Sequence, residues 1–300
     1  MSIHDKLFGV IPALATPLTY EGTIDVLNFK KLIRNVLTAG CNGIMILGSA
    51  GEGIVLDSKN YSLAVETAVT EVNGKYPVIV GAGDVSTEGV YKKSDLAFDL
   101  GADAILVVPQ CYFPIPQIGV ENFYRRLADR SKLPVMIYNI PALTKIEVGL
   151  ETVMNLSTEE NIVGMKDSSG DFAYFQRVLA YAQSSTFKVF QGRAPFFLAS
   201  VLMGADGTQG PIPNIAPQLE LGIHSAVKEG NLALAKQCQN KISEIAKMFG
   251  YSGYPVSMNL KGIMAAQGIC EKYTADPIPV LEDEIIEQFG DKFRQIMLNS

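Results

Sequence analysis

Histidine and tryptophan are scarce in this 300-residue sequence, which has no tryptophan and only two histidines, His4 and His224. Two histidines offer little basis for a histidine-based catalytic triad. The four cysteines form no Cys-x-x-Cys pair and lie far apart, at Cys41, Cys111, Cys238 and Cys270. We therefore expect buried thiols, no metal site and no disulfide framework. Acid–base chemistry must come from tyrosine, lysine, aspartate or glutamate.

Long apolar runs and a positive charge balance are also missing. No stretch approaches the roughly 18 apolar residues that span a bilayer, and the N-terminus lacks the layout of a signal peptide. The net charge of -6 and the pI near 5.1 argue against nucleic acid and anionic membrane surfaces as partners. The composition, 48% hydrophobic and 19% charged, is typical of a well-buried globular protein. We expect a cytoplasmic protein without nucleic-acid or membrane partners.

Short apolar runs alternate with longer segments of helical period along most of the chain. The eight runs cover residues 9–16, 43–48, 77–81, 104–109, 134–140, 162–165, 188–192 and 207–210. The first six are almost continuous in Ile, Val, Leu and Met, which is typical of strands buried on both faces of a parallel sheet. Helices are predicted between them over residues 25–38, 57–72, 86–100, 118–130 and 170–182.

The repeated strand–helix unit predicts an α/β fold, a (β/α)₈ TIM barrel. Gly101-Ala102-Asp103-Ala104 recurs as Gly204-Ala205-Asp206-Gly207, each time where a helix ends and an apolar run follows. A doubly wound open sheet is the alternative, but no Gly-x-Gly-x-x-Gly follows the first strand. We expect the barrel over residues 1–228 and a C-terminal helical region, 229–300, packed on it.

Lys166 ends the sixth apolar run, where a strand leads into the turn-forming sequence Asp167-Ser168-Ser169-Gly170. Burial disfavours the charged form of an amine, and an uncharged amine is a nucleophile. A lone lysine at a strand end more often reaches the solvent or pairs with a neighbour, here Asp167. The residues at the other strand ends decide between these interpretations.

In a barrel of this kind the chemistry lies at the C-terminal ends of the strands. The second strand leads into the glycine-rich Gly48-Ser49-Ala50-Gly51-Glu52-Gly53, whose N–H groups could bind a carboxylate or simply form a tight turn. The fourth and fifth strands are followed by Tyr112 and Tyr138, candidate proton carriers that could instead be packing aromatics. A buried amine, a phenol and an anion-binding turn together suit Schiff-base chemistry on a keto acid.

With these residues the chain resembles the dihydrodipicolinate synthase / N-acetylneuraminate lyase superfamily of class I pyruvate-dependent aldolases over nearly its whole length. The resemblance rests on three motifs that follow in the same order, Gly48-Ser49-Ala50-Gly51-Glu52, Tyr138-Asn139-Ile140-Pro141 and Gly164-Met165-Lys166-Asp167. It implies an enzyme without metal or organic cofactor, which uses pyruvate and an aldehyde and forms homo-oligomers, dimers or homotetramers built as dimers of dimers.

The resemblance also implies a role for each site residue. Lys166 would form the imine with the keto carbon, and Tyr138 would shuttle the proton. Ser49 would relay it between Tyr138 and a second tyrosine from a neighbouring subunit, for which Tyr112 is the best match, while the Ser49-Ala50 turn binds the pyruvyl carboxylate. Substrate contacts are further expected from the ends of the seventh and eighth strands, at Gly192 and Gln209.

Departures from the family patterns reduce the range of expected substrates. Dihydrodipicolinate synthases carry an arginine where this chain has Leu143, and sialic acid lyases carry acidic residues where Arg193 follows Gly192. A serine expected after the eighth strand is replaced by Pro211. The segments 112–114 and 166–170 look more like those of aldolases for 2-keto-3-deoxy sugar acids.

We therefore predict a lyase that reversibly cleaves a 2-keto-3-deoxy sugar acid to pyruvate and a hydroxyaldehyde. The alternatives are another imine enzyme of the superfamily or a barrel that only binds a keto acid. The imine enzymes in question are N-acetylneuraminate lyase, 4-hydroxy-2-oxoglutarate aldolase, dihydrodipicolinate synthase and a dehydratase.

Overall fold

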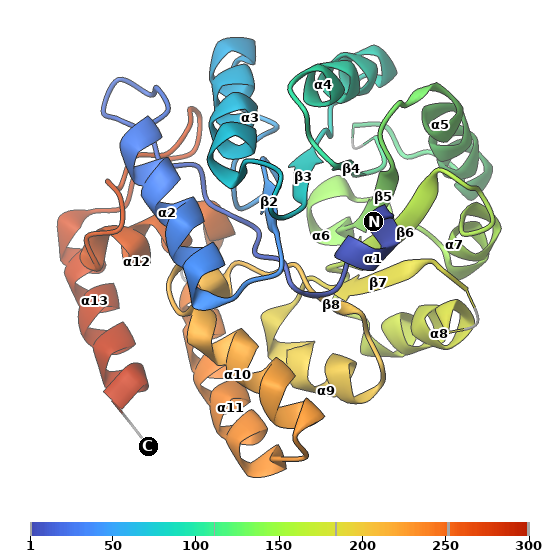
Figure 1. Cartoon of the computed structure of the whole chain (residues 1–300). Coiled ribbons are helices and arrows are strands. Elements are labelled where there is room, and N and C mark those ends of the chain that lie inside the picture. The colour runs from blue at the N-terminus through green and yellow to red at the C-terminus, as the bar shows by residue number, and fades with distance from the viewer. Residues whose placement is uncertain (1, 111, 184, 251–252, 299–300) are drawn as a thin grey trace.

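Eight parallel strands form one continuous sheet in the order β1-β8-β7-β6-β5-β4-β3-β2. This computed structural model describes residues 2–110, 112–183, 185–250 and 253–298. The strands are β1 (Gly9–Val10), β2 (Ile44–Ile46), β3 (Val78–Gly81), β4 (Ala104–Val107), β5 (Val135–Asn139), β6 (Ile162–Asp167), β7 (Lys188–Gln191) and β8 (Gly207–Thr208). Figure 1 shows helices arranged around the curled sheet. The predicted (β/α)₈ barrel is confirmed.

The barrel closes where the first strand meets the last and the second. Gly9 pairs with Gly207 of β8, and a parallel bridge joins Ala13 to Met45 of β2. The Leu14 amide donates to the Met45 carbonyl at 2.8 Å. The predicted first strand, residues 9–16, was too long: β1 ends at Val10, and beyond Pro12, which has no N–H, the chain pairs with β2 through an isolated bridge.

Helices alternate with the strands, and every helix predicted between strands is present within a few residues. The helices are α1 (Ile3–Lys6), α2 (Val26–Ala39), α3 (Ser58–Val72), α4 (Thr87–Asp99), α5 (Gln117–Arg130), α6 (Pro141–Thr144), α7 (Leu150–Leu156), α8 (Phe172–Ala182), α9 (Phe197–Leu202), α10 (Pro217–Lys228), α11 (Leu232–Phe249), α12 (Val256–Ala266) and α13 (Asp283–Leu298). The short helices α7 and α9 were not predicted, because two turns or fewer show no clear amphipathic period.

The repeated Gly-Ala-Asp sequence has the same structural role in both copies. Asp103 accepts a hydrogen bond from the Val78 amide at 2.9 Å and pairs with Lys6 at 3.0 Å. Asp206 likewise accepts from the Val189 amide at 2.8 Å and pairs with Lys188 at 2.9 Å. Each aspartate therefore fixes the start of the neighbouring strand, at the end of the barrel opposite the strand C-termini.

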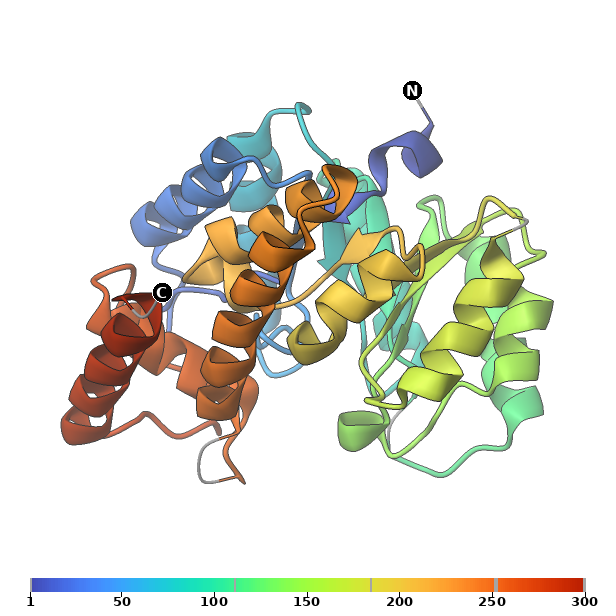
Figure 2. The same cartoon turned by 90° about the horizontal axis from the view of Figure 1, so that it is seen from below.

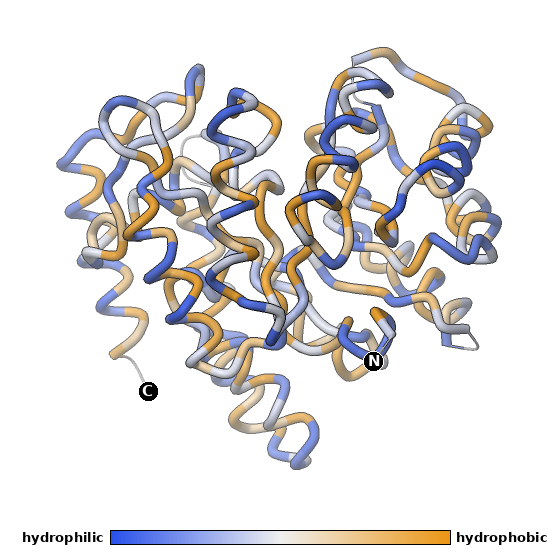
Figure 3. The backbone as a smooth tube through the Cα atoms, turned by 45° about the horizontal axis from the view of Figure 1, so that its top comes forward, coloured by the Kyte–Doolittle hydropathy of each residue, from blue (hydrophilic) through white to orange (hydrophobic). Residues whose placement is uncertain are grey.

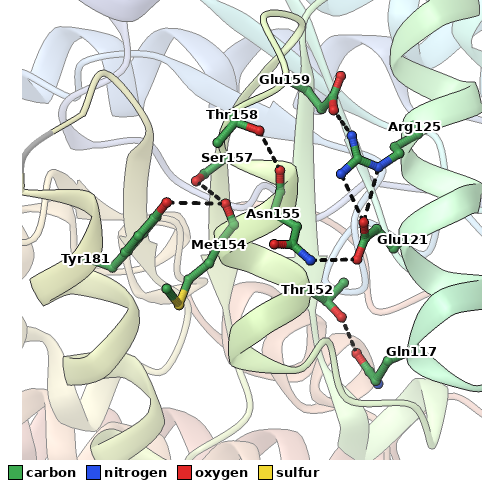
Figure 4. A network of polar contacts seen from close by, with 10 residues as sticks. All are labelled: Gln117, Glu121, Arg125, Thr152, Met154, Asn155, Ser157, Thr158, Glu159 and Tyr181. Carbon is green, nitrogen blue, oxygen red and sulfur yellow. Dashed lines mark hydrogen bonds and ion pairs between the residues drawn. The ribbon is translucent and has the colours of Figure 1, made fainter.

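A polar network on the outside of the barrel joins α5 to α7 (Figure 4). Arg125 pairs with Glu121 at 2.9 Å and also with Glu159, while the Asn155 amide donates to Glu121 at 3.0 Å. The Thr152 hydroxyl donates to Gln117 at 2.9 Å. These contacts hold α7 in place between β5 and β6, the strands that carry Tyr138 and Lys166.

The C-terminal helices α11, α12 and α13 pack beside the barrel next to α2 and α10 (Figures 1 and 2). Figure 3 shows hydrophilic stretches along the outer helices. None of the helices in the described part of the chain is long and apolar enough to cross a membrane.

Replacing Gly207 by alanine tests how tightly the barrel closes. An added Cβ would lie 1.8 Å from the Gly9 carbonyl oxygen, a backbone atom that cannot move aside. We expect Gly207→Ala to lower the free energy of unfolding by roughly 3 kcal/mol or more, measured by chemical denaturation. Gly119→Ala is the matched control, because its Cβ meets no side chain closer than 3.6 Å within α5. Equal stability of the two variants would contradict this account of closure.

Candidate active site

A cavity of about 320 Å³ opens at the C-terminal ends of the strands and holds most of the predicted site residues. A few polar side chains line it together with a larger number of apolar residues. The polar members are Ser49, Tyr138, Lys166, Ser168 and Arg193. A hollow of about 610 Å³ between α11 and α13 is larger, but none of the predicted site residues lines it. The smaller cavity is therefore the candidate active site.

Lys166 lies in the last part of β6 with its side chain turned into the barrel. It is 3% exposed, so it does not reach the solvent. It does not pair with Asp167 either, because that carboxylate accepts hydrogen bonds from Asn139 at 2.8 Å and Ser169 at 2.9 Å. Among the described residues no carboxylate lies within salt-bridge distance of the Lys166 amine. The Lys166 side chain thus faces the cavity, as the Schiff-base role predicted for it requires.

Tyr138 faces Lys166 from the neighbouring strand. The two residues are directly paired in the parallel register of β5 and β6. The Lys166 Nζ atom lies 4.4 Å from the centroid of the Tyr138 ring, and Tyr138 is 5% exposed. The structure thus brings together the amine and the phenol that the sequence analysis selected.

The turn after β2 brings Ser49 and Ala50 to the same cavity. Its conformation is tight, because Leu47 and Glu52 both have positive φ, 58° and 59°, which residues other than glycine rarely adopt. A Cβ on Gly53 would lie 2.1 Å from the Leu47 carbonyl oxygen. The glycine at this position is therefore required by the packing of the turn itself, and the turn presents Ser49 and Ala50 to the cavity in one fixed geometry.

Gly192 lies beside the lysine, at the end of β7, and lines the cavity. A Cβ at this position would lie 2.0 Å from the Ser168 Oγ atom and 2.9 Å from the Lys166 Cε atom. Ser168 was not among the predicted site residues. The sequence held a signal for it, because side chains two residues apart on an extended segment, here Lys166 and Ser168, share a face.

Gln209 and Tyr112 do not line this cavity. Gln209 is fully buried, and its amide nitrogen lies 3.8 Å from the Met136 sulfur. Met136 lies on β5 two residues before Tyr138, so this contact is deeper in the barrel than the cavity. Tyr112 is 78% exposed and stacks edge-to-face on Phe113 at 4.9 Å. The substrate contact of Gln209 and the subunit-bridging role of Tyr112 stay predictions. Cys111, which precedes Tyr112, lies outside the described residues.

The outer wall of the cavity combines Leu143 and Arg193, which the sequence analysis had compared with the family patterns, with residues of the C-terminal helices that it had not connected with the site. Leu143 follows β5, Phe249 ends α11 and Val256 begins α12. Arg193 follows Gly192 and forms no side-chain hydrogen bond or ion pair with the described residues. No local pattern in the sequence indicated Phe249 or Val256, because their contact with the cavity depends on how the C-terminal helices pack.

A buried carboxylate, Glu220 of α10, is electrostatically coupled to the lysine. It is fully buried, and neither of its oxygens makes a hydrogen bond of normal geometry with the described residues. Burial raises the pKa of Glu220 to about 8, while the charge of Lys166 and the nearby Thr208 hydroxyl act against that shift. Burial likewise raises the pKa of Asp167 to about 6. Burial thus favours the neutral form of Glu220, which weakens this group as a counter-charge for the Lys166 amine.

Metal ligation is not indicated by the residues around the site. The described part of the chain contains no group of three or more His, Cys, Asp or Glu side chains that could hold a metal ion. Cys41, Cys238 and Cys270 are free and buried.

Comparison with known proteins relates this sequence to a single family. Residues 6–296 match the Dihydrodipicolinate synthetase family. The chain is 30% identical to a probable 2-dehydro-3-deoxy-D-pentonate aldolase of Escherichia coli K12, over 93% of this chain and 94% of that protein. It is also 30% identical to a 4-hydroxy-tetrahydrodipicolinate synthase of Natronomonas pharaonis, over 96% of this chain and 97% of that protein.

A solved structure shares the fold over almost the whole chain. It is a prophage protein of Escherichia coli K12 that belongs to the dihydrodipicolinic acid synthase family and was solved in complex with pyruvate. The TM-score is 0.92 at 26% identity, and the match covers 97% of this chain and 99% of that one.

Substituting Glu220 by glutamine tests the buried carboxyl group. The folded-state pKa of about 8 lies above the ordinary value of 4.5, so the wild-type protein loses stability as the pH rises through that interval. The loss is about 1.4 kcal/mol per pH unit. Glu220→Gln should therefore be more stable than wild type at pH 9, by a few kcal/mol, and much closer to it at pH 5. Urea unfolding at both pH values measures this, and a pH-independent difference would contradict the raised pKa.

Proposed function

Because the chain belongs to the dihydrodipicolinate synthetase family, whose members are lysine Schiff-base lyases and synthases, we propose that it cleaves a 2-keto-3-deoxy sugar acid. The products are pyruvate and a hydroxyaldehyde, and the reaction is reversible. The observation that carries this proposal is the buried Lys166 amine, which has no carboxylate partner among the described residues and lies 4.4 Å from the centroid of the Tyr138 ring in the cavity.

The amine supplies the covalent step. The Lys166 Nζ atom attacks the C2 carbonyl of the keto acid, and loss of water gives an imine. Protonation makes this imine an electron sink, which accepts the electron pair of the C3–C4 bond when that bond breaks. The aldehyde leaves, the resulting enamine is protonated at C3, and water then releases pyruvate and regenerates the amine.

Tyr138 and the Ser49 turn supply proton transfer and binding. The Tyr138 hydroxyl takes the proton from the C4 hydroxyl group as the bond breaks, and it needs a relay to exchange that proton. Ser49 lines the same cavity and is the proposed relay, with Tyr112 of a neighbouring subunit as the third hydroxyl of a homo-oligomer. The backbone of the Ser49-Ala50 turn is the proposed anchor of the substrate carboxylate.

The residues of the outer part of the cavity favour a sugar acid with a single carboxylate as the substrate. Leu143 lines the cavity where dihydrodipicolinate synthases place the arginine that grips a second carboxylate. Among the described lining residues, Arg193 and Lys166 are the charged ones, and the Arg193 guanidinium offers hydrogen bonds to distal hydroxyl groups. The aldolase of Escherichia coli that is 30% identical is named for a substrate of this class.

Borohydride trapping tests the imine. Incubation with pyruvate followed by borohydride should increase the intact mass by one reduced pyruvate, and peptide mapping should place the adduct on Lys166. Lys166→Ala should abolish the adduct, because no other side-chain amine of the described part of the chain lines the cavity. Lys145→Ala is the matched control, since Lys145 is exposed, follows α6 at the mouth and donates to the Ala142 carbonyl. An adduct that survives in Lys166→Ala would remove this lysine from the mechanism.

A substrate panel tests the reaction. Five- and six-carbon 2-keto-3-deoxy aldonates should release pyruvate, detected by coupling to lactate dehydrogenase, and release should fall by at least 1,000-fold in Lys166→Ala because the covalent step is lost. Analysis of the second product distinguishes cleavage from dehydration, which releases no pyruvate. No turnover on any member of the panel would contradict the proposed substrate class.

A further inference from the structure

A fully buried ion pair holds the turn that presents Ser49 and Ala50. The Lys261 Nζ atom lies 2.7 Å from the Glu52 Oε2 atom, and both side chains are completely shielded from solvent. Glu52 is part of the turn itself, two residues after Ala50, and has a φ of 59°. Lys261 comes from the middle of α12, 209 residues further along the chain.

The pair is the centre of a small network that joins three segments. The same Glu52 oxygen accepts a hydrogen bond from the Ala275 amide at 2.9 Å. The Lys261 amine also donates to the Tyr273 carbonyl at 2.8 Å. The turn after β2, the helix α12 and the loop that follows it are thus tied to one another at a point where water is excluded.

This network lies between two parts of the cavity lining. The turn contributes Ser49 and Ala50, and the first turn of α12 contributes Val256. A hydrogen bond from the Thr16 hydroxyl to the Gly51 carbonyl, at 2.7 Å, also holds the backbone of the turn. Because a buried charge without a partner is costly, a movement of the turn away from Lys261 would be strongly unfavourable, and the pair therefore restrains the turn.

We propose, on the basis of the proposed function, that Glu52 and Lys261 are positioning residues for keto-acid binding. The C-terminal helix α12 thereby sets the geometry of the turn that binds the substrate carboxylate. Neither residue lines the cavity or touches the reacting atoms, since Lys166 and Tyr138 lie on β6 and β5. Loosening the turn therefore weakens binding of the carboxylate in the ground state and the transition state alike, which raises the half-saturating concentration and leaves the chemistry intact.

The experiment measures how borohydride trapping depends on pyruvate concentration in the full-length protein. Lys261→Met removes the cation but leaves a buried unpaired carboxylate, so that variant alone could fail to fold. The double variant Glu52→Gln/Lys261→Met leaves no buried charge and keeps an amide oxygen for the Ala275 N–H. We expect its half-saturating pyruvate concentration to rise tenfold or more, with the maximum trapped fraction unchanged, at a temperature where circular dichroism shows the variant folded.

Lys188→Met is the matched control. It removes the lysine of a similar 2.9 Å ion pair with Asp206, at the opposite end of the barrel, and should leave the half-saturating concentration within twofold of wild type. A double variant with a lower thermal midpoint but wild-type pyruvate dependence would overturn the positioning role and leave the pair purely structural. Absence of any adduct in the wild-type protein would instead overturn the proposed function, and this inference with it.

Discussion

The register between β5 and β6 is the constraint on which the site depends. Tyr138 is paired with Lys166, and because side chains alternate along each strand both point into the barrel. A shift of both strands by one residue would put Asn139 and Asp167 in the cavity and send the phenol and the amine to the outer layer. The hydrogen bond between Asn139 and Asp167, 2.8 Å long on the outside of the sheet, is therefore part of what keeps the amine and the phenol together inside.

Burial without a counter-charge gives this arrangement its chemistry. A lysine shielded from water would normally be paired with a carboxylate, and the acidic group electrostatically coupled to Lys166, Glu220, is itself so buried that its neutral form is favoured. Glycine at position 192 leaves the space next to the lysine side chain that a Cβ would otherwise occupy. The free space beside Lys166 and the shielding of its amine from water thus come from the same dense surroundings.

The C-terminal helices contribute residues to the cavity and do not only pack against the outside of the barrel. Phe249 and Val256 form part of the cavity wall, and α12 reaches the Ser49 turn through Lys261. The lining of the cavity therefore comes from both regions of the chain. This explains why the outer wall differs in chemistry from the inner end, where strands of the barrel supply the lysine and the tyrosine.

The sequence by itself determined the eight strands and the longer helices between them, because continuous apolar runs, the 3.6-residue period and helix-ending glycines are local properties. It also singled out Lys166, Tyr138 and Ser49 as candidate site residues, because each lies at the end of an apolar run and within a motif of the family. All three line the cavity. Only the tertiary structure decided that Glu52 would meet Lys261, 209 residues away, and that Phe249 would close the cavity. Contacts of this kind depend on how complete elements pack, and the residues around either partner carry no local pattern that specifies the other.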